Sequence, residues 1–104
     1  MSGMGAEKQV VTSDDGRYVV IDGRRWRATD PAIPEDVAAA LRRALMAARR
    51  DVGTALRKGE DPATARARVQ TAKVALGERG TPWWEQSPAD RRARWEQGLH
   101  DLGG

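Results

Sequence analysis

Apolar residues recur at three- and four-residue spacing across residues 34–58, and this pattern predicts a long amphipathic helix. Pro34 followed by two acidic residues is typical of a helix start, and Gly59 is typical of a helix end. Gly53 lies inside this helix at a cost of about 1 kcal/mol relative to Ala, and we interpret it as tolerated there. The predicted inner side consists of Val37, Leu41, Ala44, Leu45, Ala48, Val52, Ala55 and Leu56.

A second helix is predicted over residues 62–77, with Asp61 as its N-cap and Pro62 as its first residue. The connection that follows Gly59 is short, and a short connection forces two helices into an antiparallel hairpin. Two apolar stripes on this helix predict burial on both of its sides. The inner stripe is Ala65, Val69, Ala72 and Leu76, and the second is Ala63, Ala67 and Val74.

A third, short helix is predicted over residues 88–101, with Ser87 as its N-cap. Its apolar side is predicted to be Ala89, Ala93, Leu99 and Leu102, with Trp95 at the flank. The segment around Trp83 and Trp84 is predicted to cross between the second and third helices in extended or turn form.

Residues 9–28 have a different pattern, made of short β-type runs separated by Asp-Gly pairs. Asp22-Gly23 predicts a two-residue turn that pairs Val19 with Trp26 and Tyr18 with Arg27. In this register, one face is expected to pack inward and the other to place a guanidinium against the Tyr18 ring. The inward face carries Val19, Ile21 and Trp26, and the outward face carries Tyr18, Val20, Arg25 and Arg27.

Together these elements predict an α+β, mostly helical fold. An N-terminal antiparallel β-hairpin or three-stranded meander is expected to pack on the helical hairpin, with the third helix closing the domain. The 104 residues suit one core, so residues 9–102 are predicted to form a single domain. Residues 1–8 are expected to be disordered, and residues 103–104 to be a ragged end.

Composition alters this picture in two respects. Leu, Ile, Val and Phe are few, so alanines and four tryptophans must fill the core, and a second copy of the chain could complete it. A homodimer is therefore predicted. The chain has no cysteine and no apolar run as long as a membrane span, so we expect a cytoplasmic protein with no membrane association.

A row of arginines lies on the side of the first helix away from its leucines. It consists of Arg42 and Arg49, seven residues apart, and of Arg43, Arg50 and Arg57 at the same spacing. Such a row can track phosphates or face an acidic protein. It can also be a solvated surface, or pair with acids such as Glu78 and Glu85 brought near by the fold.

Trp83 and Trp84 invite two interpretations. Adjacent flat rings near arginines can stack on bases or sugars, but such a pair more often fills a core. We favour one ring buried against the helical hairpin and the other at its rim. The nearby run that contains Arg91, Arg92 and Arg94 is interpreted as a surface paired with neighbouring acids.

The sequence contains few candidate catalytic residues. The single histidine, His100, lies near the C-terminus, Ser13 and Ser87 have no obvious base, and the acids at helix starts act as caps. No metal-ligand spacing and no phosphate-binding loop is present in the sequence. The sequence therefore predicts no enzymatic activity, no cofactor and no small-molecule ligand.

Four segments resemble an uncharacterised bacterial family whose members sometimes carry the automatic label "biopolymer transporter Tol". The segments are residues 20–34, 44–50, 72–80 and 82–85, and the resemblance covers roughly residues 18–97. The resemblance implies that some longer relatives continue into a second small domain, which we do not expect in this chain. The resemblance implies no catalytic residues, and without a transmembrane pattern we do not carry the transporter label over.

The function that these observations predict is a non-enzymatic protein-interaction module, which presents basic helix faces to an acidic protein or to a second copy of itself. The alternative is a small nucleic-acid-binding protein that uses the arginine row with Tyr18, Arg25 and Trp83.

Overall fold

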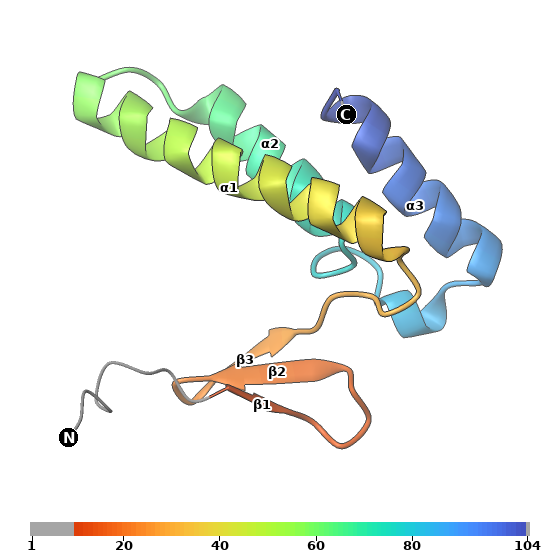
Figure 1. Ribbon diagram of the computed structural model, residues 1–104. Coiled ribbons are helices and arrows are strands. Elements are labelled where there is room, and N and C mark those ends of the chain that lie inside the picture. The colour runs from red at the N-terminus through yellow and green to blue at the C-terminus, as the bar shows by residue number, and fades with distance from the viewer. Residues whose placement is uncertain (1–9, 104) are drawn as a thin grey trace.

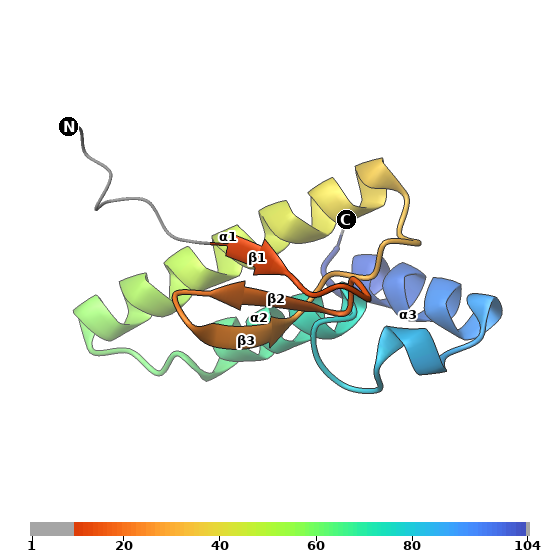
Figure 2. The ribbon, with the colours of Figure 1, turned by 90° about the horizontal axis from the view of Figure 1, so that it is seen from below.

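The computed structural model describes residues 10–103 and has the predicted α+β, mostly helical fold (Figure 1). The predictions for residues 1–8 and for Gly104 lie outside the described residues. The elements are β1 (Val10–Thr12), β2 (Tyr18–Ile21), β3 (Arg24–Arg27), α1 (Glu35–Lys58), α2 (Ala63–Ala75), the short 3-10 helix η2 (Trp83–Glu85) and α3 (Pro88–Asp101). The three α-helices form one layer, and the sheet lies to one side of it (Figures 1 and 2).

The sheet is an antiparallel meander in the order β1-β2-β3. Val19 faces Trp26 across β2 and β3, and the whole register of this pair of strands is the predicted one. The turn between them has positive φ at both Asp22 (51°) and Gly23 (82°), which a type I′ turn requires. A two-residue Asp-Gly turn was therefore enough to fix which residues share a face.

The inward face of the sheet is less buried than the sequence suggested. Val19 and Ile21 are half-buried, but 41% of Trp26 is exposed, so the prediction that Trp26 packs inward is wrong. The three side chains line one wall of an open groove whose other wall comes from α1 and α2. The sheet faces the helices across this groove instead of filling it.

The connection between α2 and α3 holds the sheet to the helical layer. Asp30 N–H donates to Leu76 O (2.9 Å), Arg27 Nη1 donates to Gly80 O (2.8 Å), and Thr29 Oγ1 donates to a Glu78 carboxylate oxygen (2.7 Å). All three bonds join residues 27–30 to residues 76–80. The end of β3 is thereby fixed next to the end of α2.

Helix α1 begins and ends as the sequence predicts, within one residue. Its C-terminus is closed at Gly59, whose φ of 72° allows Glu60 N–H to donate to Ala55 O (2.8 Å). Leu56 was predicted to be an inner residue but is 54% exposed. The last turn of α1 leads into the connection to α2 (Figure 1), and Leu56 belongs to this exposed end of the helical hairpin.

Helix α2 starts at Ala63, one residue later than predicted, so its N-cap is Pro62 and the prediction of Asp61 in that position is wrong. Asp61 Oδ1 nevertheless accepts a hydrogen bond (2.9 Å) from the N–H of Ala63, the first residue of the helix. The predicted second stripe is wrong for Ala63 and Ala67, which are exposed, while Val74 is half-buried. Helix α2 packs mainly on α1 and α3. Ala63 and Ala67 lie on the part of its surface that neither helix covers.

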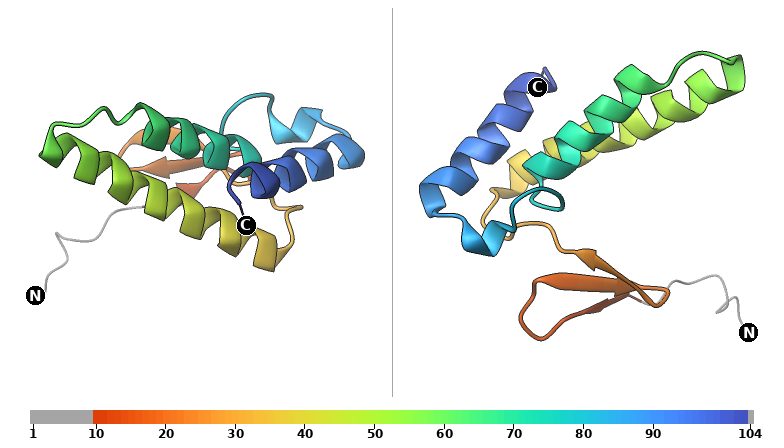
Figure 3. Two further views of the ribbon diagram at one scale, coloured as in Figure 1. Left: turned by 90° about the horizontal axis from the view of Figure 1, so that it is seen from above. Right: turned by 180° about the vertical axis from the view of Figure 1, so that it is seen from behind.

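The core lies where the three helices meet (Figure 3). Its buried members are Ile33, Ala38, Leu41, Leu45, Ala72, Ala75, Leu76 and Trp95. Trp95 was expected at the flank of α3 but belongs to this core, whereas the predicted inner residues Ala89 and Ala93 are exposed. The large ring turns α3 so that its tryptophan, and not its early alanines, faces α1 and α2.

Two glycines inside helices have opposite surroundings. At Gly98, an added Cβ would lie 2.3 Å from the Cβ of Ala75, so α3 approaches α2 as closely as it does only because Gly98 has no side chain. At Gly53, an added Cβ would meet only the flexible end of Arg57, at 3.3 Å. The interpretation of Gly53 as a tolerated residue agrees with this open surrounding.

Candidate basic interface on α1

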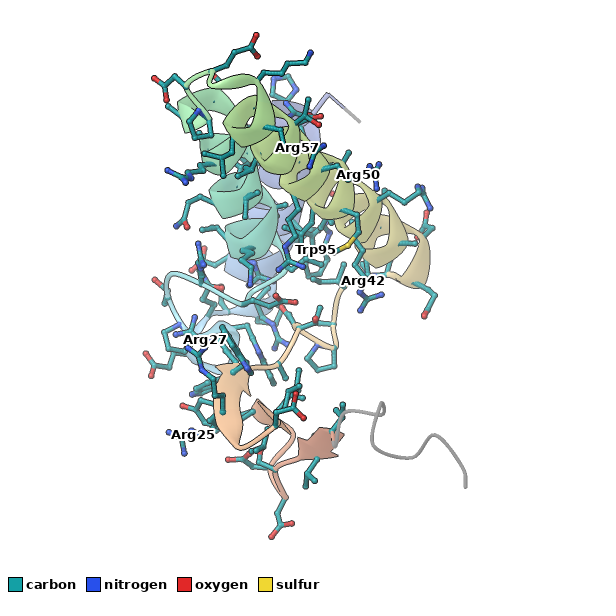
Figure 4. The ribbon with its side chains drawn as sticks, turned by 90° about the vertical axis from the view of Figure 1, so that its left-hand side faces the viewer. Arg25, Arg27, Arg42, Arg50, Arg57 and Trp95 are labelled. Atoms are coloured by element: carbon teal, nitrogen blue, oxygen red, sulfur yellow. The ribbon has the colours of Figure 1, made fainter. Side chains whose placement is uncertain are left out.

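The basic face of α1 consists of five arginines that are all exposed: Arg42, Arg43, Arg49, Arg50 and Arg57. Figure 4 shows Arg42, Arg50 and Arg57 spaced along the helix. Arg49 lies at the border of this face, because it lines both the groove beneath the helix, with Lys73, and a hollow on the outer side, with Met46. The five arginines therefore form a band that wraps partly around α1.

None of these five arginines forms an ion pair within residues 10–103. The ion pairs of that region are Lys73–Glu78, Arg91–Asp30, Arg92–Glu96 and Arg94–Asp30. Glu78, which the sequence offered as a partner for the row, is instead occupied by Lys73 and Thr29. Apart from a hydrogen bond between Arg57 Nη2 and Thr54 Oγ1 (3.2 Å), the guanidinium groups face solvent.

A shallow hollow of about 470 Å³ lies within the basic face. It is lined by Met46, Arg49, Arg50, Gly53, Thr54 and Arg57. Met46 exposes 42% of its surface there, and Gly53 contributes no side chain. The face thus combines positive charge with a small apolar spot and a place where another backbone can come close.

A second cluster joins arginines to aromatic rings on the outward face of the sheet. The Arg25 guanidinium carbon lies 4.1 Å from the centre of the Tyr18 ring, which confirms the predicted pair. The Trp84 ring packs edge-on to Tyr18 at 5.5 Å, with Arg17 at 4.9 Å and Arg27 at 5.8 Å. In Figure 4, Arg25 and Arg27 lie on β3, well apart from the labelled arginines of α1.

The two adjacent tryptophans lie in different environments, as the sequence suggested. Trp83 is 7% exposed, and its Nε1–H donates to Ala28 O (3.0 Å). The ring packs on Gly77, where an added Cβ would lie 3.1 Å from Trp83 Cδ1. Trp84 is half-buried at the rim. Burial removes Trp83 from the surface, so only Trp84 remains as a candidate for stacking.

Sequence reasoning missed Asp30, the most buried charged residue within residues 10–103. Asp30 is 1% exposed and accepts hydrogen bonds from Arg91 and from Arg94 Nη2 (2.6 Å), as well as from Ala32 N–H (2.8 Å). The interpretation of the arginine run on α3 as a surface network is therefore wrong for Arg91 and Arg94. It holds for Arg92, which pairs with Glu96 at 2.9 Å.

One signal in the sequence pointed to this cluster. Arg91 and Arg94 are three residues apart, so they lie on one side of α3, and Asp30 precedes a proline at the end of the strand region. The sequence does not show that these two places meet, because 61 residues separate Asp30 from Arg91. The same arginine, Arg94, also donates to Gln86 Oε1 (2.6 Å) and to Ala75 O (3.2 Å).

The Asp30 cluster predicts an acid-sensitive fold. Burial by itself raises the pKa of Asp30, but hydrogen bonds from Arg91, Arg94 and Ala32 outweigh it and lower the pKa from 3.8 to about 2. As the pH falls, the Asp30 carboxylate is therefore protonated in the unfolded chain before it is protonated in the folded protein. Stability of about 2 kcal/mol is present above pH 5 and is lost between about pH 4 and pH 2. Urea unfolding at pH 6, 4, 3 and 2 measures this loss of stability. In an Asp30→Asn variant, the part of the pH dependence that comes from Asp30 should be absent.

His100 is exposed on the last turn of α3 and makes no hydrogen bond to a carboxylate within residues 10–103. In the same range, no group of three or more His, Cys, Asp or Glu side chains is placed to hold a metal ion. No helix there is both long enough and apolar enough to cross a membrane.

Fold and surface together define a small α+β protein with a basic helix face. Comparisons with protein-family models, with curated proteins and with solved structures found no match to this chain. The resemblance of the four sequence segments therefore stays a prediction.

Proposed function

We propose that this protein is a non-enzymatic interaction module that binds an acidic protein through the basic face of α1. The observation that carries the proposal is the absence, within residues 10–103, of any carboxylate partner for the five exposed arginines. Arg91 and Arg94, by contrast, both pair with the buried Asp30 inside the fold. A row without such partners is available to a second molecule.

An acidic amphipathic helix fits this face best. Exposed charges alone add little affinity, but they orient a partner and speed its association. Met46 supplies an adaptable apolar contact, and Gly53 lets a second helix approach α1 closely. Glutamates on either side of the partner's apolar stripe would meet Arg50 and Arg57.

A second copy of the chain fits this face poorly, because a two-fold axis would place identical arginine rows opposite each other. The predicted homodimer therefore requires another surface. The edge strand β1 is one such surface, since Val10 and Val11 are both about 60% exposed. The proposed setting is the cytoplasm, in keeping with a chain that has no cysteine.

Nucleic-acid binding is the second candidate, and the arginine–aromatic cluster around Tyr18 and Trp84 is the observation in its favour. Two features weigh against it. Trp83 is buried, and the cluster on the sheet lies apart from the basic face of α1, so one strand would have to follow both surfaces to use all the proposed residues (Figure 4).

Fluorescence anisotropy separates the two candidates. The probes are a labelled helical peptide with leucine and glutamate at helical spacing, a labelled DNA and a labelled RNA, each at about 50 and 200 mM salt. We expect the peptide to bind. We also expect the combined variant Arg43→Gln, Arg50→Gln and Arg57→Gln to weaken its binding by about tenfold, since three exposed charged contacts of about 0.5 kcal/mol each are lost.

The matched control removes the same number of positive charges elsewhere, as Arg66→Gln, Arg79→Gln and Arg92→Gln, all at exposed positions. Equal losses in the two triple variants would mean a nonspecific charge effect and would overturn the proposal. Tighter binding of DNA or RNA than of the peptide, with a steep loss at the higher salt, would transfer the function to the second candidate.

A further inference from the structure

The groove between the sheet and the helices has the size of a ligand site. Its volume is about 470 Å³, within the range of roughly 300–1,000 Å³ that is usual for small-molecule pockets. Residues of the sheet and of the helical layer line it from opposite sides. In Figures 1 and 2 the sheet lies to one side of the helical layer. The side chains that matter are Val19, Ile21 and Trp26 on the sheet and Arg49, Lys73 and Glu78 on the helical side.

The sheet wall carries an apolar patch of Val19, Ile21 and Trp26 beside charged residues, and Trp26, the largest of the three, is incompletely covered. Trp26 leaves 41% of its surface exposed, although the fold buries Trp83 and Trp95 almost completely. Its ring has cations near it: the Arg24 guanidinium carbon lies 4.7 Å from the ring centre and Lys73 Nζ lies 5.8 Å away. A flat apolar group placed in the groove would cover this ring and remove apolar area from water.

The groove is positively charged. Four cationic residues line it against two acidic ones: Arg24, Arg27, Arg49 and Lys73 against Asp22 and Glu78. Glu78 is already engaged, because it accepts from Thr29 Oγ1 at 2.7 Å and lies 3.8 Å from Lys73 Nζ. Arg49 has no carboxylate partner within residues 10–103.

The lowered pKa of Lys73 agrees with this excess of positive charge. Burial lowers the pKa of Lys73, and the neighbouring guanidinium groups of Arg49 and Arg79 lower it further, although Glu78 acts in the opposite direction. One carboxylate is thus too few for the cations at this wall. A second, supplied by a ligand, would balance them.

We propose that the groove binds a carboxylate attached to a flat apolar body, with the apolar body against Trp26 and the carboxylate toward Arg49 and Lys73. A free aromatic acid and the C-terminus of a peptide that ends in an aromatic residue both have this chemistry. The site is separate from the outer hollow of α1, and only Arg49 borders both.

Titration of the ¹⁵N-labelled full chain, followed by NMR, tests the site and distinguishes the two sources. The probes are phenylacetate, an acetylated tripeptide that ends in phenylalanine with a free carboxylate, and the same tripeptide as its amide. We expect saturable shifts of the Trp26 indole N–H, assigned with a Trp26→Phe variant, and of the Thr29 and Lys73 amides. The indole signals of the buried Trp83 and Trp95 should move little.

The variants test the assigned roles. Arg49→Gln and Lys73→Gln should each weaken carboxylate binding by about tenfold, the effect of losing one charge-assisted contact, and should leave the weak binding of the amide unchanged. Arg66→Gln, at an exposed arginine of α2 that does not line the groove, is the matched control and should bind as the wild type does. Because Arg49 is exposed, its variant keeps the fold even if Lys73→Gln does not.

Several results would overturn the site. The first is the absence of saturable shifts up to about 10 mM ligand, a concentration at which a site with a millimolar Kd would be occupied. The second is equal binding of the acid and amide peptides. The third is a set of shifts confined to the outer face of α1. Tighter binding of phenylacetate than of the peptide would identify a free acid as the ligand, and the reverse order would identify a peptide terminus.

Discussion

The Asp30→Asn variant is expected to lose about 3 kcal/mol of unfolding free energy, since removing one partner of a buried ion pair leaves the other charge uncompensated. Asp30 is the carboxylate that both Arg91 and Arg94 contact, and its side chain is fully buried. Asparagine has nearly the same shape but no charge. A domain of this size has a total stability of about 5–15 kcal/mol, so the variant should unfold at a much lower urea concentration.

Glu96→Gln is the matched control for this prediction. It also removes one carboxylate from an arginine pair, but Arg92 and Glu96 are both more than half exposed, and such surface pairs contribute about 0–1 kcal/mol. Urea unfolding followed by circular dichroism gives both values. Similar losses for the two variants would show that the Asp30 cluster does not hold the sheet region to the helices.

Gly98→Ala is expected to destabilise the protein by about 2 kcal/mol, although alanine is the better helix former by about 1 kcal/mol. The new methyl group would lie 2.3 Å from the Cβ of Ala75, so α3 must move away from α2. Trp95 and Leu41 belong to the same core, and their packing would loosen with the helix. Thermal and urea unfolding of the variant measure the loss.

Two further variants distinguish a steric clash from a general effect of glycine replacement. Gly53→Ala introduces the same methyl group where only the end of Arg57 is near, and should stabilise the protein by about 0.5–1 kcal/mol. Adding Ala75→Gly to Gly98→Ala removes the opposing methyl group and should recover part of the loss. Failure of this second change to recover any stability would contradict the close-contact explanation.

The elements of this fold could be predicted because their signals are local. The three- and four-residue spacing of apolar residues defined α1, Asp22-Gly23 defined the register of β2 and β3, and Asp61 marked the start of α2 to within one residue. Each depends on residues only a few positions apart. Burial was predicted less well, since an alanine on a helix is buried only where a neighbouring element covers it, as Ala63 and Ala67 show.

The contacts that join these elements could not be predicted for the same reason. Asp30 meets Arg91 and Arg94 across more than sixty residues, and Gly98 meets Ala75 on a different helix. Nothing in the pattern of either partner points to the other. The groove at Trp26 was also invisible in the sequence, because alternation along a strand predicts a buried face and not how closely helices approach it.

The arginine row is the part of the candidate site that the sequence did identify. Seven-residue spacing placed Arg43, Arg50 and Arg57 on one side of α1, and the structure leaves all three exposed. The structure added the hollow at Met46 and Gly53, and it excluded the intramolecular partner Glu78 that the sequence had left open. With these additions, the proposed partner of the surface can be specified as an acidic amphipathic helix.

Selection from a displayed library of random peptides tests the central proposal most directly, because it requires no prior choice of partner. The full chain serves as bait, and the Arg43→Gln, Arg50→Gln and Arg57→Gln triple variant serves as counter-selection. We expect the enriched peptides to carry aspartate or glutamate on either side of apolar residues at helical spacing, and to lose binding to the triple variant. Enrichment of peptides without acidic residues, or of peptides that the triple variant retains, would contradict the assignment of this face as the binding surface.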